Sequence, residues 1–165
     1  MTDVRDAAIG DLPRIVEIYN ESIPSRQATA DLEPVTVEDR RPWFEAHVPG
    51  RRPLWVTERG GSVVAWLSLE TFYGRAGYDQ TAEVSVYVAG EHQGRGVGAA
   101  LLSRAVERAS ALDVSTLVAF VFAHNEASVA LFERFGFARW GHLPRVARLD
   151  GVERDVVILG RRVGD

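Results

Sequence analysis

The sequence contains neither cysteine nor lysine, and all 19 side chains counted as lysine or arginine are arginine. Without cysteine there is no disulfide framework, no thiolate metal site and no cysteine acyl-enzyme. Without lysine there is no Schiff base to pyridoxal phosphate and no Walker A loop, which requires a lysine after its last glycine. A catalyst in this chain therefore has to work with carboxylates, histidine, hydroxyls and backbone amides.

Charge and hydropathy exclude further classes of protein. The 23 acidic residues outnumber the arginines, for a net charge of −4, and arginine pairs such as Arg51 and Arg52 are scattered. No apolar run reaches the ~20 residues of a membrane span, and the acidic first residues do not resemble a signal peptide. We expect a cytoplasmic protein with no nucleic-acid or membrane partner. A length of 165 residues with 46% hydrophobic content fits a single domain, residues 1–165.

Hydrophobic spacing and turn residues predict a mixed α/β chain. Thr36 and Asp39 resemble a capping box at the start of a helix, and the apolar run 116–122 is typical of a strand covered on both faces. Because a hairpin meander is combined with crossover connections, we expect a mixed sheet. The predicted strands are 4–7, 54–58, 63–72, 83–88, 116–122, 137–149 and 152–159, and the predicted helices are 12–23, 37–47, 99–112 and 126–135.

A glycine-rich segment, Gln93 to Gly98, lies between a predicted strand and a predicted helix. Glycines at the start of a helix allow a phosphate to approach free backbone amides, although a plain tight turn is an alternative. A dinucleotide loop is a third interpretation, because Gly94, Gly96 and Ala99 fit G-x-G-x-x-A. That loop requires an acid at the end of the following strand. The strand ends at Phe122 without one, which disfavours a dinucleotide site.

The same segment resembles the pyrophosphate loop of the GNAT superfamily of N-acetyltransferases, which bind acetyl-CoA. Gln93, Gly96 and Gly98 stand at the three motif positions, and the block from Asn125 to Phe137 resembles the second motif. Within the superfamily, the chain is most similar to the branch of phosphinothricin acetyltransferase and related amino-acid N-acetyltransferases. The stretches that carry this likeness are 18–21, 31–34, 83–88 and 155–157.

The resemblance implies a GNAT fold, in which about seven mixed strands and about four helices form a V-shaped cleft for acetyl-CoA. It implies direct transfer of acetyl to the amine of an amino acid or analogue, such as phosphinothricin or methionine sulfone, in a ternary complex. It also implies a homodimer. Four dispersed histidines and the absence of cysteine disfavour a metal site. A backbone amide near Val88, where the family's strand splays, is the expected oxyanion donor. The expected cofactor-binding residues are Tyr87, Val88, Gln93, Gly94, Arg95, Gly96, Val97, Gly98, Asn125 and Ser128.

Acetyl transfer needs a base, because an ammonium has an ordinary pKa of about 10.4. Glu83 is the candidate, since it lies at the start of the strand that leads into the glycine segment. It also stands where the branch has a glutamate. Strand alternation places Glu83, Ser85 and Tyr87 on one face, unless a bulge of the kind common in the family breaks that alternation. A solvated acid at the end of the strand is the alternative interpretation of Glu83.

The chain departs from the branch at positions near the acceptor. Phe132 stands where the family often has tyrosine or histidine, and it cannot donate a proton; a thiol of pKa about 8.5 can instead leave as thiolate. Ala30 stands where a substrate-side loop usually has phenylalanine, and Val84 replaces an asparagine. Arg75 can clamp a substrate carboxylate or lie solvated in its loop.

These departures leave other functions open. An acetyltransferase for protein N-termini or for an amine without a carboxylate has the same cofactor loop. A non-catalytic module that binds acyl-CoA also fits, because Phe132 lacks a hydroxyl. The likeness to the branch therefore does not identify the acceptor.

Overall fold

A computed structural model describes residues 3–164 and contains the strands and helices in the predicted order. Short 3₁₀ turns separate several of them. The elements are β1 (Asp3–Asp6), α1 (Leu12–Ser22), α2 (Val37–Glu45), β2 (Leu54–Arg59), β3 (Ser62–Thr71), β4 (Thr81–Val88), α3 (Val97–Arg108), β5 (Thr116–Phe122), α4 (Glu126–Arg134), β6 (Ala138–Leu149) and β7 (Val152–Arg162).

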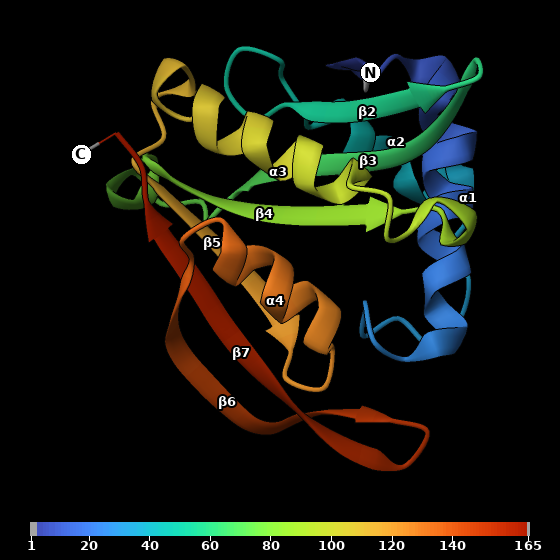
Figure 1. Cartoon of the computed structure of the whole chain (residues 1–165), viewed down its shortest axis with the longest axis vertical. Coiled ribbons are helices and arrows are strands. Elements are labelled where there is room, and N and C mark those ends of the chain that lie inside the picture. The colour runs from blue at the N-terminus through green and yellow to red at the C-terminus, as the bar shows by residue number, and fades with distance from the viewer. Residues whose placement is uncertain (1–2, 165) are drawn as a thin grey trace.

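The seven strands form one mixed sheet in the order β1-β2-β3-β4-β5-β7-β6 (Figure 1). Every neighbouring pair is antiparallel except β4 and β5, which are parallel. The last strand lies between β5 and β6, so the final hairpin joins the sheet through its second strand. The predicted mixed α/β architecture is confirmed.

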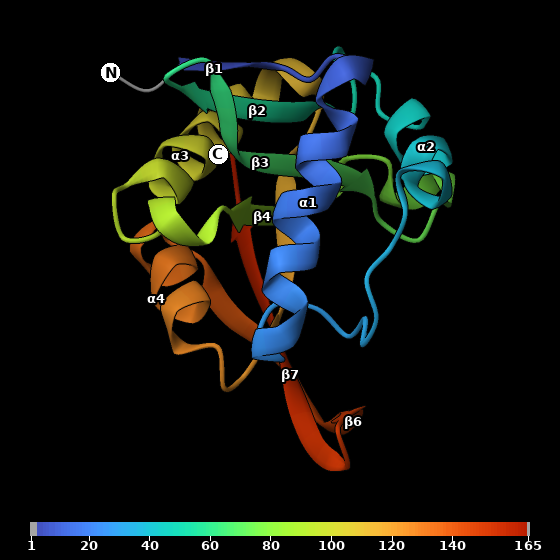
Figure 2. The ribbon, with the colours of Figure 1, turned by 90° about the vertical axis from the view of Figure 1, so that its right-hand side faces the viewer.

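Helices cover both faces of the sheet, with α3 and α4 on one side and α2 on the other (Figure 2). One hydrophobic core lies under α3 and α4 and includes Leu101 and Leu117. A second core lies between α1 and strands β2 and β3, and it includes Ile18 and Trp66. The indole Nε1–H of Trp66 donates to the backbone oxygen of Ile15, which satisfies its buried polar atom.

Local signals explain where the helices begin. The Oγ1 atom of Thr36 accepts from the amide of Asp39 at 3.0 Å, and the Asp39 carboxylate accepts from the amide of Thr36 at 3.4 Å. The predicted capping box is therefore confirmed. Helix α3 begins at Val97 instead of residue 99, because Gly96 has a left-handed backbone and acts as the N-cap.

Other predicted boundaries, and one predicted environment, are also wrong. The helix predicted over 99–112 ends as α3 at Arg108, and a separate 3₁₀ turn follows over Ser110–Leu112. Strand β7 continues to Arg162, beyond the predicted residue 159, and pairs with β5 along that extension. Phe120 on β5 is 40% exposed, because the α1 and α2 core covers β2 to β4 and leaves this part of β5 open.

Arg52 is a buried anchor for the start of β4, whereas its neighbour Arg51 is exposed. The Arg52 side chain is 4% exposed, and Nη2 donates to the carbonyls of Asp79 at 2.6 Å and Thr81 at 3.3 Å. Charge-assisted bonds to buried carbonyls are stronger than neutral ones. Arg52 therefore fixes the loop that leads into β4.

We expect Arg52→Met to lower the free energy of unfolding by about 2 kcal/mol, because the carbonyls of Arg51, Asp79 and Thr81 lose their donor. Urea denaturation measures this loss. Arg51→Met is the matched control, since Arg51 makes only an exposed ion pair with Asp79 at 3.4 Å, worth less than about 1 kcal/mol. Equal losses in the two variants would contradict the anchoring role.

Candidate active site

The site begins where β4 and β5 separate. These strands pair only over Thr81–Glu83 and Thr116–Val118, and beyond these residues they diverge (Figure 1). The predicted V-shaped cleft is present, and it opens directly after Glu83, earlier along β4 than the expected point near Val88. A cavity in the cleft is lined by Gln27, Ala28, Val84, Ser85, Val86, Tyr87, Phe120, Val121, Phe122, Asn125, Ser128 and Phe132.

The glycine segment connects the end of β4 to α3. Gly94 and Gly96 have positive φ angles of 73° and 79°, a conformation that side chains other than glycine disfavour. A Cβ atom at either position would meet nothing within 4 Å, so the loop surface is open. Gly96 caps α3 without a side-chain hydrogen bond, and the first amides of a helix have no acceptor within it. The loop can therefore bind an anion.

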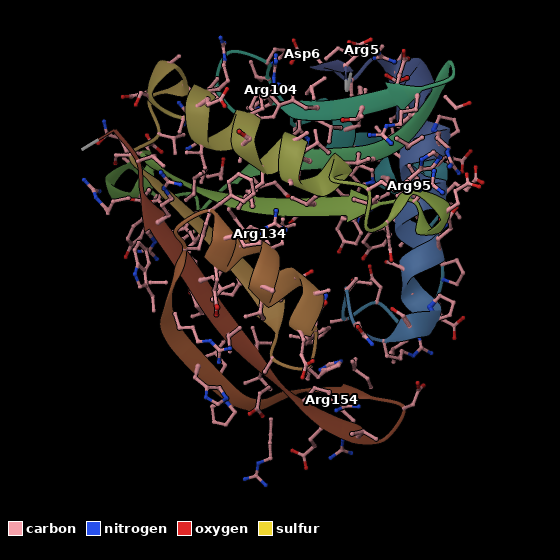
Figure 3. All side chains as sticks on the ribbon, viewed as in Figure 1. Arg5, Asp6, Arg95, Arg104, Arg134 and Arg154 are labelled. Atoms are coloured by element: carbon pink, nitrogen blue, oxygen red, sulfur yellow. The ribbon has the colours of Figure 1, made fainter. Side chains whose placement is uncertain are left out.

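The neighbours of this loop determine its shape. The Gln93 side chain donates through Nε2 to the Val88 carbonyl at 3.3 Å, which closes the loop onto β4. At Gly98, a Cβ atom would contact Val88 and Leu131 at 3.5–3.6 Å, so this position brings α3 close to β4 and α4. Arg95 is exposed at the start of α3 (Figure 3). Its guanidinium is available to a phosphate.

The amide of Val88 faces the cleft. The next amide, that of Ala89, donates to the Val64 carbonyl on the β3 side at 2.8 Å. Because successive residues of a strand direct their backbone groups to opposite sides, the Val88 N–H points toward the gap between β4 and β5. A developing oxyanion in the cleft would meet this donor.

The two faces of β4 differ in chemistry, as the alternation of its residues predicts. The register with β3 runs without a shift from Thr71 opposite Ala82 to Ala65 opposite Val88. Val84 belongs to the core under α3, whereas Tyr87 packs against the core under α1. Glu83 lies on the same face as Tyr87, away from α3 and α4.

Glu83 is half-buried and does not itself line the cavity, although its neighbours Val84 and Ser85 do. Burial raises the pKa of the Glu83 carboxyl, and the negative charge of Glu70 raises it further. Such an environment favours proton uptake and is common for a general base.

A strap, residues 26–31, crosses the open end of the cleft. Three consecutive carbonyls of the strap contact side chains on both walls: Arg26 with His124 Nε2 at 2.8 Å, Gln27 with Asn125 Nδ2 at 3.0 Å, and Ala28 with the Tyr87 hydroxyl at 3.1 Å. The strap therefore joins the end of β4 to the loop after β5.

Side chains of the strap also hold it to distant elements. The Arg26 guanidinium pairs with Asp150, at the turn between β6 and β7, at 2.7 Å. The Thr29 hydroxyl lies 2.6 Å from the Tyr19 hydroxyl, which also bonds to Asp31. The strap is consequently tied to α1, β4, the β5–α4 loop and the last hairpin.

Only some of the residues named from the sequence line the cavity. The structure brings Tyr87, Asn125 and Ser128 together at the cavity, with the Asn125 Oδ1 atom capping α4 by accepting from the Ser128 amide at 3.2 Å. Arg75 and Ala30 are exposed and do not line this cavity; Arg75 precedes a 3₁₀ turn in the loop after β3.

Several cavity residues were not named from the sequence. Gln27 and Phe120 carry no motif, and their place at the cleft follows from long-range contacts of the strap and the sheet. His124 is half-buried against the strap and stacks on Phe122. Phe132 is 4% exposed, lines the cavity and packs on Phe137.

Within residues 3–164, no group of three histidine or acidic side chains is arranged to hold a metal ion. None of the described helices is long and apolar enough to cross a membrane.

Comparison with known proteins identifies the family. Residues 12–137 match the model of the acetyltransferase (GNAT) family. The chain belongs to the GNAT acetyltransferase family. It is 51% identical to YwnH of Bacillus subtilis (strain 168), over 93% of this chain and 94% of that protein.

Two further relatives have more specific names. The GNAT chain is 33% identical to the L-methionine sulfoximine/L-methionine sulfone acetyltransferase of Pseudomonas paraeruginosa (strain DSM 24068 / PA7), over 94% of this chain and 91% of that protein. It also matches the crystal structure of a GNAT superfamily phosphinothricin acetyltransferase from Sinorhizobium meliloti in complex with acetyl-CoA. That match has a TM-score of 0.93, 29% identity, and coverage of 99% of this chain and 89% of the other.

Variants of Asn125 separate its two contacts in this GNAT chain. Asn125→Asp keeps an oxygen for the Ser128 amide and removes the donor to Gln27, whereas Asn125→Ala removes both. We expect the alanine variant to lose about 1 kcal/mol of stability through the lost helix cap, and the aspartate variant to lose less. In both variants trypsin should cleave faster after Arg26, because the strap is held more weakly.

Mass spectrometry of the fragment ending at Arg26 measures this cleavage. An aspartate variant cleaved at the wild-type rate would show that the bond to Gln27 does not hold the strap.

Proposed function

We propose that the chain is an acetyl-CoA-dependent N-acetyltransferase for the amine of a small amino acid or analogue, of the class that includes phosphinothricin and methionine sulfone. One observation supports it above the others: a half-buried carboxylate with a raised pKa, Glu83, lies where β4 leaves β5 and the cleft opens. The names of the methionine sulfone and phosphinothricin relatives support the substrate class.

Acetyl-CoA fits the groups that the chain offers. The open glycine segment and the first amides of α3 suit the pyrophosphate, with the exposed Arg95 beside them. The narrow cleft between β4 and β5 suits the pantetheine arm, with the Asn125 amide at one rim and Ser128 nearby. The cosubstrate supplies an activated acetyl thioester.

In the proposed reaction Glu83 takes a proton from the acceptor ammonium, and the neutral amine attacks the thioester carbon directly. The amide of Val88 donates to the oxygen that becomes negative. The nitrogen gives its second proton to water as the carbon–sulfur bond breaks, because Glu83 already holds the first proton. Since Phe132 has no proton to give, CoA leaves as thiolate and takes a proton from water.

We expect Glu83→Gln to lower kcat/KM about 100-fold at pH 7, the lower end of what a general base contributes. The loss should shrink as pH rises, because more of the acceptor is already neutral. In the wild type, the acidic limb of the profile should lie above the ordinary glutamate pKa of about 4.3, because the pKa of Glu83 is raised.

Steady-state thiol release across pH measures both profiles, with acetyl-CoA affinity and circular dichroism as controls for folding. Parallel wild-type and variant profiles would falsify the assignment of the base.

An acceptor panel tests the substrate class. We expect turnover with amino acids, amino-acid sulfones and sulfoximines or phosphinothricin to exceed turnover with polyamines and peptide N-termini. Arg75 is proposed to bind the acceptor carboxylate, and Ala30 to lie near the acceptor. Arg75→Met should therefore raise the acceptor KM while kcat changes little. Preference for amines without a carboxylate would contradict the role of Arg75 and favour the alternative acceptors.

A second candidate function is a non-catalytic module that binds acyl-CoA. The buried phenyl ring of Phe132 favours it, because no hydroxyl at that place can protonate a leaving group. Tight acetyl-CoA binding with no thiol release across the whole acceptor panel would support this module over the enzyme.

We also propose that the chain is a single cytoplasmic catalytic domain, residues 1–165, that forms a homodimer. Exposed apolar side chains on the last three strands support self-association: Phe120, Trp140, Leu143, Val146 and Val152. Light scattering measures the molar mass, and a monomer at micromolar concentration would contradict the dimer. Cell fractionation tests the location.

A further inference from the structure

A second carboxylate lies beside the proposed base. Glu70 on β3 is directly opposite Glu83 on β4 in the antiparallel register, and the Cβ atoms of such pairs are typically about 4.5–5.5 Å apart. Glu70 belongs to no motif of the sequence, and only the register of β3 on β4 places it at the site.

The two carboxylates lack a neighbouring cation. In residues 3–164 neither forms an ion pair, and the hydrogen bond of Glu70 comes from the Ser68 hydroxyl at 3.2 Å to Oε2. On β5, the partner of Glu83 is the apolar Val118. Like charges directly opposite each other in a sheet repel, more so when half-buried.

One titratable ring also faces Glu70. His47 follows α2, and its Nδ1 atom lies 2.8 Å from the Trp43 carbonyl. Burial lowers the pKa of His47 more than these neighbours raise it. The ring is therefore neutral at neutral pH and does not compensate the charge of the carboxylates.

We propose that Glu70 is a positioning residue for acetyl transfer, which strengthens Glu83 as a base by holding a second negative charge opposite it. The inference rests on the proposed function, in which Glu83 takes the proton. In that step the ammonium N–H bond breaks and a Glu83 O–H bond forms. Glu70 neither gains nor loses a proton. The pair passes from two negative charges to one, so the proton transfer relieves their repulsion.

Glu70→Gln tests the inference, because it keeps the size of the side chain and removes its charge. We expect the acidic limb of the kcat/KM profile to move down by about half a pH unit, and kcat/KM at neutral pH to fall several-fold because the base is weaker. The titration of Glu83, followed by NMR of ¹³C-labelled glutamate without substrates, should move by the same amount.

Two variants control for charge and shape. Glu70→Asp keeps the charge and should leave the limb near its wild-type position. Glu107→Gln removes an exposed charge on α3, where Glu107 accepts from Ser103, and should change neither readout. If Glu70→Gln does not fold, Glu70→Ala is the second neutral variant, and the same downward movement is required of it.

The outcomes separate the inference from the proposed function. The role of Glu70 would be overturned if the neutral variants changed neither the NMR titration of Glu83 nor the acidic limb of the kcat/KM profile. Glu83 would then remain the proposed base. A wild-type chain that transfers no acetyl group to any acceptor would overturn the proposed function, whereas the NMR titration would still decide whether Glu70 acts on Glu83.

Discussion

Only three residue pairs, Thr81–Glu83 with Thr116–Val118, join β4 to β5. Past them, the cleft-facing backbone groups of β4 have no strand to pair with. The end of β4 leads into the glycine segment, and the end of β5 leads to Asn125. One interruption of the sheet therefore places the open glycine segment on one rim and the Asn125 amide on the other, with cleft-facing backbone groups of β4 between them.

Because the side chains of a strand alternate between its two faces, the two faces of β4 make different contacts. Its even-numbered residues pack in the core under α3 and α4. On the opposite face, Tyr87 stacks on Trp66 with ring centroids 4.7 Å apart, and Glu83 faces Glu70 further along the same two strands. An aromatic end and an acidic end thus share one face. Half-burial and the nearby charge of Glu70 raise the pKa of Glu83, because water does not fully screen the two carboxylates.

The strap shows how parts distant in sequence complete the site. Arg26 is held by Asp150, and the carbonyl of Gln27 is held by Asn125, about a hundred residues further along the chain. The Asn125 side chain therefore has two uses: its oxygen caps α4 and its amide group holds the strap. A bound pantetheine arm at this rim would have to share or replace the contact with Gln27.

Local patterns predicted the elements well, since the capping pair at Thr36 and Asp39 and the glycine segment 93–98 are signals contained within a few residues. They were less accurate where the tertiary environment decides. Phe120 has the apolar character of a covered strand but lies in an open part of the sheet. Arginine is a residue type that is mostly exposed, but Arg52 is buried and donates to backbone carbonyls at the start of β4.

The sequence by itself determined the type and order of the helices and strands, the parity of Glu83 and Tyr87 on β4, and the loop suited to a phosphate. Only the tertiary structure decided that β7 lies between β5 and β6, that the strap crosses the cleft, and that Glu70 faces Glu83. The reason is physical. Caps, turns and alternation depend on neighbours along the chain, whereas strand order and register depend on which distant surfaces bury each other best.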